Sequence, residues 1–119
     1  MKRTIIFIAA MLASLPAFAF SGRADFDATF QSLLPKAINT NTTCERGICE
    51  FGAIVPRQGG YYRINTYTNE ENTRVVSKLI CTSIDATHLN CVSSDGVAWN
   101  EEFNGVSWLP ITGTSSKAW

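Results

Sequence analysis

The sequence predicts an α+β, mostly β domain, in which one N-terminal helix packs on an antiparallel meander of about six strands. The meander is expected to form either a curled sheet or a small barrel. Three observations support this fold class. Helical periodicity is confined to one segment, the strand-like segments that follow are joined by hairpin-length turns, and four cysteines can form two cross-strand disulfides. Connections this short leave no room for the crossover helices that parallel strands require.

The N-terminus has the three parts of a secretory signal peptide. A basic region at Lys2 and Arg3 precedes an apolar run and an Ala-x-Ala cleavage site at residues 17–19. Even a generous count gives that apolar stretch 17 residues, which is fewer than the roughly 20 needed to span a membrane. We therefore expect a cleaved signal peptide over residues 1–19 and a single disulfide-stabilised domain over residues 20–119. The domain is expected to be exported by a Gram-negative bacterium, to the periplasm or beyond, with no stable membrane insertion after cleavage.

The charge of the predicted domain excludes several classes of partner. Without Lys2 and Arg3 the chain has ten acidic and eight basic side chains, which gives a formal net charge of −2. This weak acidity provides no long-range attraction for nucleic acids or anionic membranes. No phosphate-binding glycine loop, metal triad or cofactor motif occurs in the sequence. We therefore expect no nucleic-acid partner, no cofactor and no metal.

The predicted helix occupies residues 21–38. Four apolar residues of this segment share one helical face: Phe26, Phe30, Leu33 and Leu34. Asp25 and Asp27 suit its first turn, where carboxylates interact favourably with the helix dipole. Pro35 is expected to end or kink the helix, because proline lacks the backbone N–H and crowds the preceding turn. Residues 39–43 are expected to be a polar connector.

Two disulfides are predicted from the four cysteines of the domain: Cys44, Cys49, Cys81 and Cys91. A two-residue turn at residues 46–47 places the first pair, Cys44 and Cys49, directly opposite each other. An odd-length turn centred on Ala86 does the same for the second pair, and opposed strand residues lie close enough for a disulfide. We prefer these pairs to a zinc site, whose cysteines usually have tighter spacing, and to a redox centre, which requires Cys-x-x-Cys.

Strand patterns separated by turn residues fill the chain after the first cysteine pair. The sequence predicts six strands, at residues 49–56, 61–68, 74–84, 89–93, 97–103 and 106–111. The pair Asn104-Gly105 between Phe103 and Val106 is the strongest signal for a two-residue hairpin turn. The tail, residues 112–119, shows no strand pattern and is expected to be loose.

Strand pairing across the turns divides the side chains between two faces, because side chains alternate strictly along a strand. One face is apolar and is expected to be core: Phe51, Ala53, Val55, Tyr62, Ile64, Val75, Leu79 and Cys81. The other face mixes apolar and cationic side chains: Ile54, Tyr61, Arg63, Tyr67, Val76, Lys78 and Ile80. Either the N-terminal helix covers this mixed face, with the cations at its rim, or the face binds a partner. One helix can cover only one face, so the two interpretations exclude each other.

The last predicted hairpin places four apolar side chains on one side: Trp99, Phe103, Val106 and Trp108. Glu101 is expected opposite Trp108. This cluster is either a second section of core or an aromatic platform for a sugar or a peptide, the latter requiring polar side chains nearby. Seven residues are therefore candidates for partner binding: Ile54, Tyr61, Arg63, Tyr67, Lys78, Trp99 and Trp108.

No catalytic set emerges from the sequence. The one histidine, His88, lies in a predicted turn, the cysteines are assigned to disulfides, and no Gly-x-Ser-x-Gly occurs. Glu101 and Glu102 are adjacent on a strand, so they point to opposite faces and cannot both flank one glycosidic bond. We therefore predict no catalytic residues.

Three functional hypotheses follow. The first is an exported, non-enzymatic binding protein of inhibitor, immunity or exclusion type that blocks a protein partner. The alternative is a carbohydrate-binding subunit of an adhesin or toxin, with tryptophan and tyrosine as stacking surfaces. The third, a small secreted hydrolase, would have to depend on His88.

Overall fold

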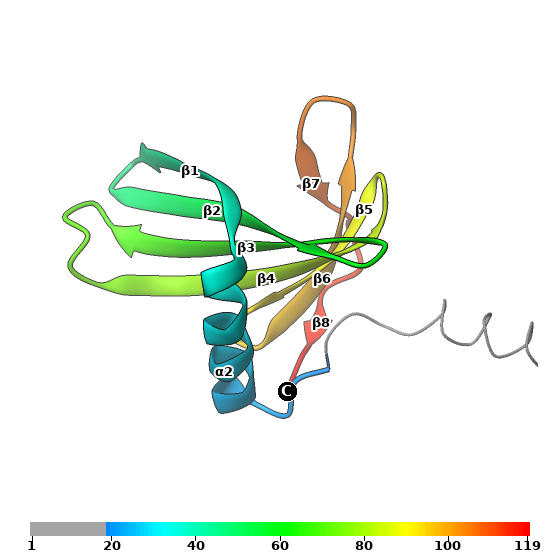
Figure 1. Cartoon of the computed structure of the whole chain (residues 1–119), viewed down its shortest axis with the longest axis horizontal. Helices are drawn as coiled ribbons and strands as arrows, with labels where there is room; N and C mark the ends of the chain where they lie inside the picture. Colours follow the sequence, from blue (N-terminus) through cyan, green and yellow to red (C-terminus); the bar gives the residue numbers. More distant parts are fainter. Residues whose placement is uncertain (1–18) are drawn as a thin grey trace, which may run out of the picture.

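The computed structural model describes residues 19–119, so nearly all of the predicted signal peptide lies outside the described residues. The chain begins with one helix and continues as antiparallel strands that form a curled, half-barrel sheet (Figure 1). Seven strands lie in the sheet in the order of the sequence, and a short eighth strand pairs with the sixth. The predicted architecture of a helix on an antiparallel meander is confirmed, with a curled sheet in place of a closed barrel.

The elements have the following bounds: α2 Arg23–Leu33, the 3₁₀ turn η1 Leu34–Lys36, β1 Ile38–Glu45, β2 Ile48–Arg57, β3 Gly60–Asn69, β4 Val75–Asp85, β5 His88–Ser93, β6 Val97–Phe103, β7 Trp108–Pro110 and β8 Ser116–Lys117. Within residues 19–119 no helix has the length and apolar character needed to cross a bilayer.

The helix α2 buries the apolar face that its periodicity predicts. Phe26, Phe30 and Leu33 are buried against the sheet, whereas Leu34 is 47% exposed. Pro35 follows directly, and the chain tightens into the 3₁₀ turn η1 at Leu34. A 3₁₀ turn has 3.0 residues per turn instead of 3.6, so Leu34 rotates away from the apolar face.

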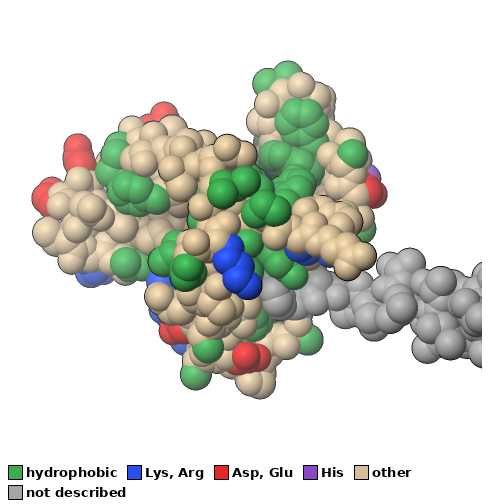
Figure 2. Space-filling view, in the orientation of Figure 1, with side chains coloured by type: hydrophobic (Ala, Val, Ile, Leu, Met, Phe, Trp, Pro, Cys, Tyr) green, Lys and Arg blue, Asp and Glu red, His purple; other side chains and the backbone are tan. Residues whose placement is uncertain are grey.

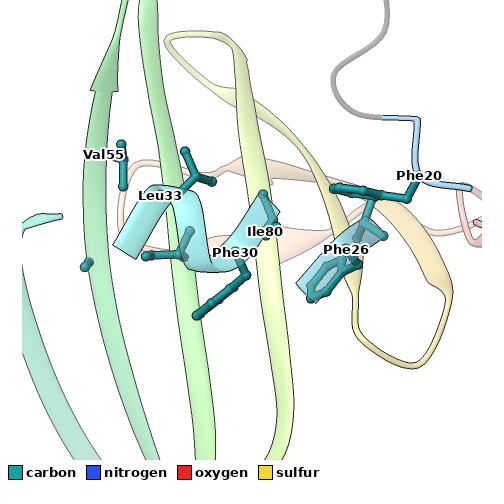
Figure 3. Close-up of a cluster of buried hydrophobic side chains, with 9 residues drawn as sticks. Phe20, Phe26, Phe30, Leu33, Val55 and Ile80 are labelled. Atoms are coloured by element: carbon teal, nitrogen blue, oxygen red, sulfur yellow. The ribbon is translucent and has the colours of Figure 1, made fainter. Parts of the chain in front are cut away.

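The main core lies between α2 and one face of the sheet (Figure 3). It consists of nine buried apolar residues: Phe20, Phe26, Phe30, Leu33, Ala53, Val55, Ile64, Ile80 and Val92. The tail, predicted to be loose, is fixed to this core. β8 pairs with β6. The ring centroid of Trp119 lies 5.9 Å from the ring centroid of Phe26 and 6.2 Å from that of Phe20. A two-residue strand is too short for a sequence pattern to predict it.

Both predicted disulfides are present, Cys44–Cys49 between β1 and β2 and Cys81–Cys91 between β4 and β5. The first hairpin turns at Arg46 and Gly47, which both have positive φ, as a two-residue turn of this kind requires. The second hairpin differs from the odd-length turn expected. Its turn has two residues, and an irregularity between Ser83 and Asp85 restores the register that opposes the cysteines.

The strand β1 includes residues 39–43, which the sequence predicts to be a connector. Every residue of β1 is exposed, so apolar alternation gives no sign of a strand there. Its pairing follows from the hairpin that the first disulfide closes, because the chain before that turn lies alongside β2. Tyr62 opposite Val55 and Ile64 opposite Ala53 match the predicted register of β2 and β3.

The predicted faces of β4 are reversed in the structure. Ile64 of β3 pairs with Ile80, which places Ile80 in the core beneath α2 and puts Leu79 and Cys81 on the opposite face. The register shifts between Tyr67 and Thr68. A shift of one residue moves every side chain of a strand to the other face. Lys78 therefore also lies on the helix side.

The turn before β4 also differs from the one that the sequence predicts. The side chain of Asn69 accepts hydrogen bonds from the backbone N–H groups of Thr73 and Arg74, at 2.9 and 2.8 Å. This side-chain cap holds a loop longer than the four-residue turn that the sequence predicts at residues 69–72. The longer loop pairs Thr68 with Val75 in place of Thr73, a shift of two residues that keeps the parity, and the bulge between Tyr67 and Thr68 then reverses the faces of β4.

The last hairpin also has a longer loop than the predicted Asn-Gly turn. Phe103 pairs with Trp108, and Glu101 pairs with Pro110, not with Trp108. The side-chain oxygen of Asn104 accepts hydrogen bonds from the backbone N–H groups of the second and third residues after it, at 2.8 and 2.9 Å. Val106 consequently sits at the loop tip, 87% exposed, and not in the apolar cluster.

Candidate functional site

The candidate site is the concave face of the sheet, on the side opposite α2. Because the sheet curls, residues of β1, β2 and β3 line the same cavity as Glu101 of β6, Trp108 of β7 and Ser107, which precedes β7. This cavity has a volume of about 580 Å³. Figure 2 shows the notch between the lobe formed by β1 and β2 and the projecting β6–β7 hairpin. The helix covers the other face, so the interpretation that the helix covers the predicted mixed face is wrong.

The structure brings together six of the seven predicted partner-binding residues. Four of them line the cavity: Ile54, Arg63, Tyr67 and Trp108. Tyr61 and Trp99 pack beside them on the same face. Lys78 lies on the helix side, where its ammonium group is 3.7 Å from the Asp27 carboxylate and 5.3 Å from the centre of the Phe30 ring. The reversed register of β4 explains this exception.

A second buried cluster forms the floor of the concave face. It consists of Leu79 and Leu89 together with the two half-cystines Cys81 and Cys91. Four aromatic side chains pack against this cluster: Tyr61, Tyr67, Trp99 and Trp108. The cross-strand disulfide is therefore part of the floor on which the aromatic residues pack, and it ties β4 to β5.

A buried ion pair connects the two walls of the cavity. Arg63 of β3 donates from Nη2 to Oε1 of Glu101 on β6, at 2.9 Å. Trp99 Nε1 donates to the other carboxylate oxygen, also at 2.9 Å. Glu101 is only 7% exposed, so this set of bonds compensates for removing its charge from water. The pair spans β4 and β5, which lie between its two strands in the sheet.

A second carboxylate, Glu50 of β2, lies in the same cavity. Asn65 Nδ2 and the Tyr67 hydroxyl both donate to Oε2 of Glu50, at 2.6 and 3.1 Å. Burial, with a smaller contribution from the neighbouring Glu50 charge, raises the pKa of Tyr67 to about 12. The tyrosine is therefore a neutral O–H donor over the whole physiological pH range. Both donors to Glu50 are uncharged.

Sequence reasoning missed Glu50, Asn65 and Glu101 as members of the site. A single glutamate or asparagine on a strand is ordinary, and only the pairing of β2 with β3 and the curl toward β6 bring these polar groups together. Gly52 is the one available signal. A Cβ at this position would lie 2.8 Å from Asn41 Oδ1 and 3.2 Å from Asn65 Nδ2, so the glycine makes room for the two amides.

Two polar atoms of the cavity residues are buried without a hydrogen-bond partner among the described residues, Arg63 Nε and Asn65 Oδ1. The orientation of the Asn65 amide follows from its contact, because a carboxylate can only accept and the nitrogen must therefore face Glu50. Unsatisfied buried groups are uncommon in folded proteins and call for a specific explanation. Three further atoms of this kind lie outside the cavity, in Arg57, Thr68 and Thr82.

His88, the residue on which hydrolysis would depend, lies away from this cavity. Its Nδ1 is 2.9 Å from Asp85 and its Nε2 is 3.1 Å from Glu102. The hydrogen bond to Asp85 raises the pKa of the imidazole, and bonds from Thr87 N–H and His88 lower the pKa of Asp85. The Thr87 hydroxyl also lies 3.1 Å from Nδ1, the nitrogen that faces Asp85, whereas in a catalytic triad the carboxylate and the hydroxyl bind different ring nitrogens.

The concave face thus combines aromatic side chains, a buried ion pair and a carboxylate held by neutral donors, and its floor contains a disulfide. Two disulfides and no free cysteine among residues 19–119 indicate an oxidising, extracellular-type environment. Comparison of the chain with protein-family models, with curated proteins and with solved structures finds no match.

Proposed function

We propose that this is a non-enzymatic, exported binding protein of inhibitor, immunity or exclusion type, which holds a protein partner in its concave face. The observation that carries the proposal is that α2 leaves this face uncovered although it is rich in aromatic side chains. An uncovered face with four aromatic side chains and an arginine has the composition of an interface centre.

The rigidity of the face supports binding by a preformed surface. The disulfide Cys81–Cys91 is part of the floor on which the aromatic residues pack, and the ion pair between Arg63 and Glu101 fixes β3 relative to β6. Side chains held in this way lose little further freedom when a partner docks, so more of the contact energy remains as affinity.

Trp108 provides the sharpest test of this proposal. It is half-buried at the cavity wall, and its ring centroid is 5.3 Å from that of Phe103. Its neighbour Leu109 is 49% exposed and, by strand alternation, points away from the cavity. Trp108→Ala should therefore reduce partner binding by tenfold or more, whereas Leu109→Ala should leave it unchanged.

The assay is affinity capture from periplasmic and culture-medium fractions with the oxidised protein as bait. The proposal predicts a protein retained by the wild type and by Leu109→Ala but lost with Trp108→Ala. Thermal melts of both variants establish that they fold. No protein retained in this pattern would refute a protein-binding function of the concave face.

One observation favours a carbohydrate ligand as the second candidate. The aromatic platform does have polar neighbours, since Trp99 shares Glu101 with Arg63, and Tyr67 shares Glu50 with Asn65. A carbohydrate-binding subunit of an adhesin or toxin should give hits on a glycan array and form a symmetric oligomer in sedimentation. A monomer without glycan hits would exclude it.

A further inference from the structure

We propose that Glu50 is the cation-accepting position of the concave face, and that the partner protein inserts an arginine or lysine side chain there. This inference rests on the proposed function and narrows it to a partner that presents a basic side chain on a projecting segment.

The charges of the cavity are unbalanced. Its charged residues are Glu50, Arg63 and Glu101. The arginine is already engaged by Glu101, at 2.9 Å. Within residues 19–119 no basic side chain forms an ion pair with Glu50. One negative charge therefore remains in a partly desolvated cavity, where an added cation interacts more strongly than it would in water.

The hydrogen bonds of Glu50 leave one oxygen available. Both neutral donors, Asn65 and Tyr67, bind the same oxygen, Oε2. Oε1 accepts no hydrogen bond from the described residues and is not among their buried unpaired atoms. The carboxylate is thus fixed in direction by two bonds while its second oxygen stays open to the cavity.

Asn65 supplies a second, independent indication of a ligand that donates hydrogen bonds. Its Oδ1 is an acceptor without a partner, and the residue is only 5% exposed. Asn65 lines the same cavity as Glu50, and its Nδ2 already binds the Glu50 carboxylate. A guanidinium or an ammonium group carries several donors, which suits one carboxylate oxygen and one amide oxygen together.

The walls of the cavity suit an organic cation. Tyr67 and Trp108 line the cavity in which Glu50 lies, and aromatic faces attract a guanidinium or ammonium group. A metal ion is disfavoured, because the described residues include no group of three histidine, cysteine, aspartate or glutamate side chains arranged to hold one. A basic side chain at the end of a flexible stem can reach the carboxylate from a bulky partner.

A peptide titration tests the inference. The probes are two acetylated and amidated pentapeptides, Gly-Ser-Arg-Ser-Gly and its citrulline analogue, which keeps the shape of arginine without its charge. Titrated into the ¹⁵N-labelled oxidised protein, the arginine peptide should shift the indole N–H of Trp108 and the side-chain amide of Asn65. We expect a dissociation constant on the order of 1 mM, as befits one side chain, and binding about tenfold weaker for the citrulline peptide.

A matched pair of variants assigns the effect to one carboxylate. Glu50→Gln retains an oxygen to accept from Asn65 and Tyr67 but removes the charge, so it should weaken the arginine peptide about tenfold. Glu70→Gln removes the same charge from the exposed turn after β3 and should have no effect. Binding to the wild type should also weaken as salt is raised.

The outcomes separate this inference from the proposed function. Equal affinity for the arginine and citrulline peptides, or equal affinity of wild type and Glu50→Gln, would overturn the cation site. Capture of a protein partner that Trp108→Ala abolishes but Glu50→Gln does not would also overturn it, while the proposed function would stand. Shifts at the cavity with neutral oligosaccharides and not with the arginine peptide would overturn it in favour of a glycan ligand.

Discussion

Replacement of Glu101 by leucine should destabilise the domain, because it leaves the Arg63 guanidinium charged and unpaired in the cavity. Loss of one member of a buried pair costs about 3–5 kcal/mol, and an exposed pair contributes about 0–1 kcal/mol. The side chains of Glu101 and Arg63 are 9% and 21% exposed, so the pair is nearer the buried limit. With a discount for the partial exposure of Arg63, we expect a loss of about 2–3 kcal/mol.

The double variant Arg63→Met/Glu101→Leu separates stability from function. Replacing both members of a buried pair with apolar side chains of similar volume is often neutral. We therefore expect the double variant to lie within about 1 kcal/mol of the wild type and to lose partner binding. This result would mean that the ion pair between Arg63 and Glu101 serves partner binding and adds little to the stability of the fold.

Urea denaturation followed by tryptophan fluorescence measures these differences, with the slope of the transition checked for constancy. In a thermal melt of a domain of this size, Glu101→Leu should lower the melting temperature by roughly 10–20 °C. Glu102→Leu is the matched control, because Glu102 is exposed on the opposite face of β6 and its carboxylate binds His88. Its replacement should change the free energy of unfolding by about 0.5 kcal/mol or less. A Glu101→Leu variant as stable as this control, or a double variant less stable than Glu101→Leu, would refute the reasoning.

Two further predictions concern the helix and the β4–β5 turn. Phe26→Ala should cost about 3–5 kcal/mol in chemical denaturation, because the ring is fully buried against Phe20 and Trp119; a loss no larger than that of the half-exposed control Leu34→Ala would contradict the packing described. His88 should titrate in NMR above 6.5, and Asp85→Asn should lower that pKa. Folding raises the pKa of His88, so its charged form stabilises the folded state. This contribution to the free energy of unfolding is complete below about pH 6.5, and it is lost as the pH rises through the pKa of His88 in the folded protein. An unchanged pKa in Asp85→Asn would disprove the contact.

Residues close in sequence were sufficient to predict the pairing of two strands where the turn between them fixes that pairing by itself. The spacing of Cys44 and Cys49 around Arg46-Gly47 admits one short hairpin, and the disulfide follows from it. The register of β2 and β3 follows in the same way from the turn between them. The helical face of Phe26, Phe30 and Leu33 was likewise predictable, because each of these side chains lies one turn from the next.

Local signals failed where a polar side chain reshapes a turn. Asn69 caps a longer loop before β4, and Asn104 does the same before β7. The sequence shows these asparagines but not whether their side chains bond to the backbone two to five residues away. Each longer loop shifts a pairing by two residues and so keeps its parity. Val106 was assigned to the wrong cluster because it lies inside the longer loop before β7. Lys78 was assigned to the wrong face because the bulge between Tyr67 and Thr68 adds one residue to the pairing of β4.

The sequence alone determined the helix, the six predicted strands and the pairing of the cysteines, but neither β1 nor β8. It also determined that Arg63, Tyr67, Trp99 and Trp108 belong to surfaces unlike an ordinary solvated face. These are properties of neighbours along the chain, set by periodicity and turn length. Only the tertiary structure decided that α2 covers the opposite face and that the curl places Glu50 of β2, Arg63 of β3 and Glu101 of β6 around one cavity. That outcome depends on strand twist and on burial summed over the whole sheet, which no single segment encodes.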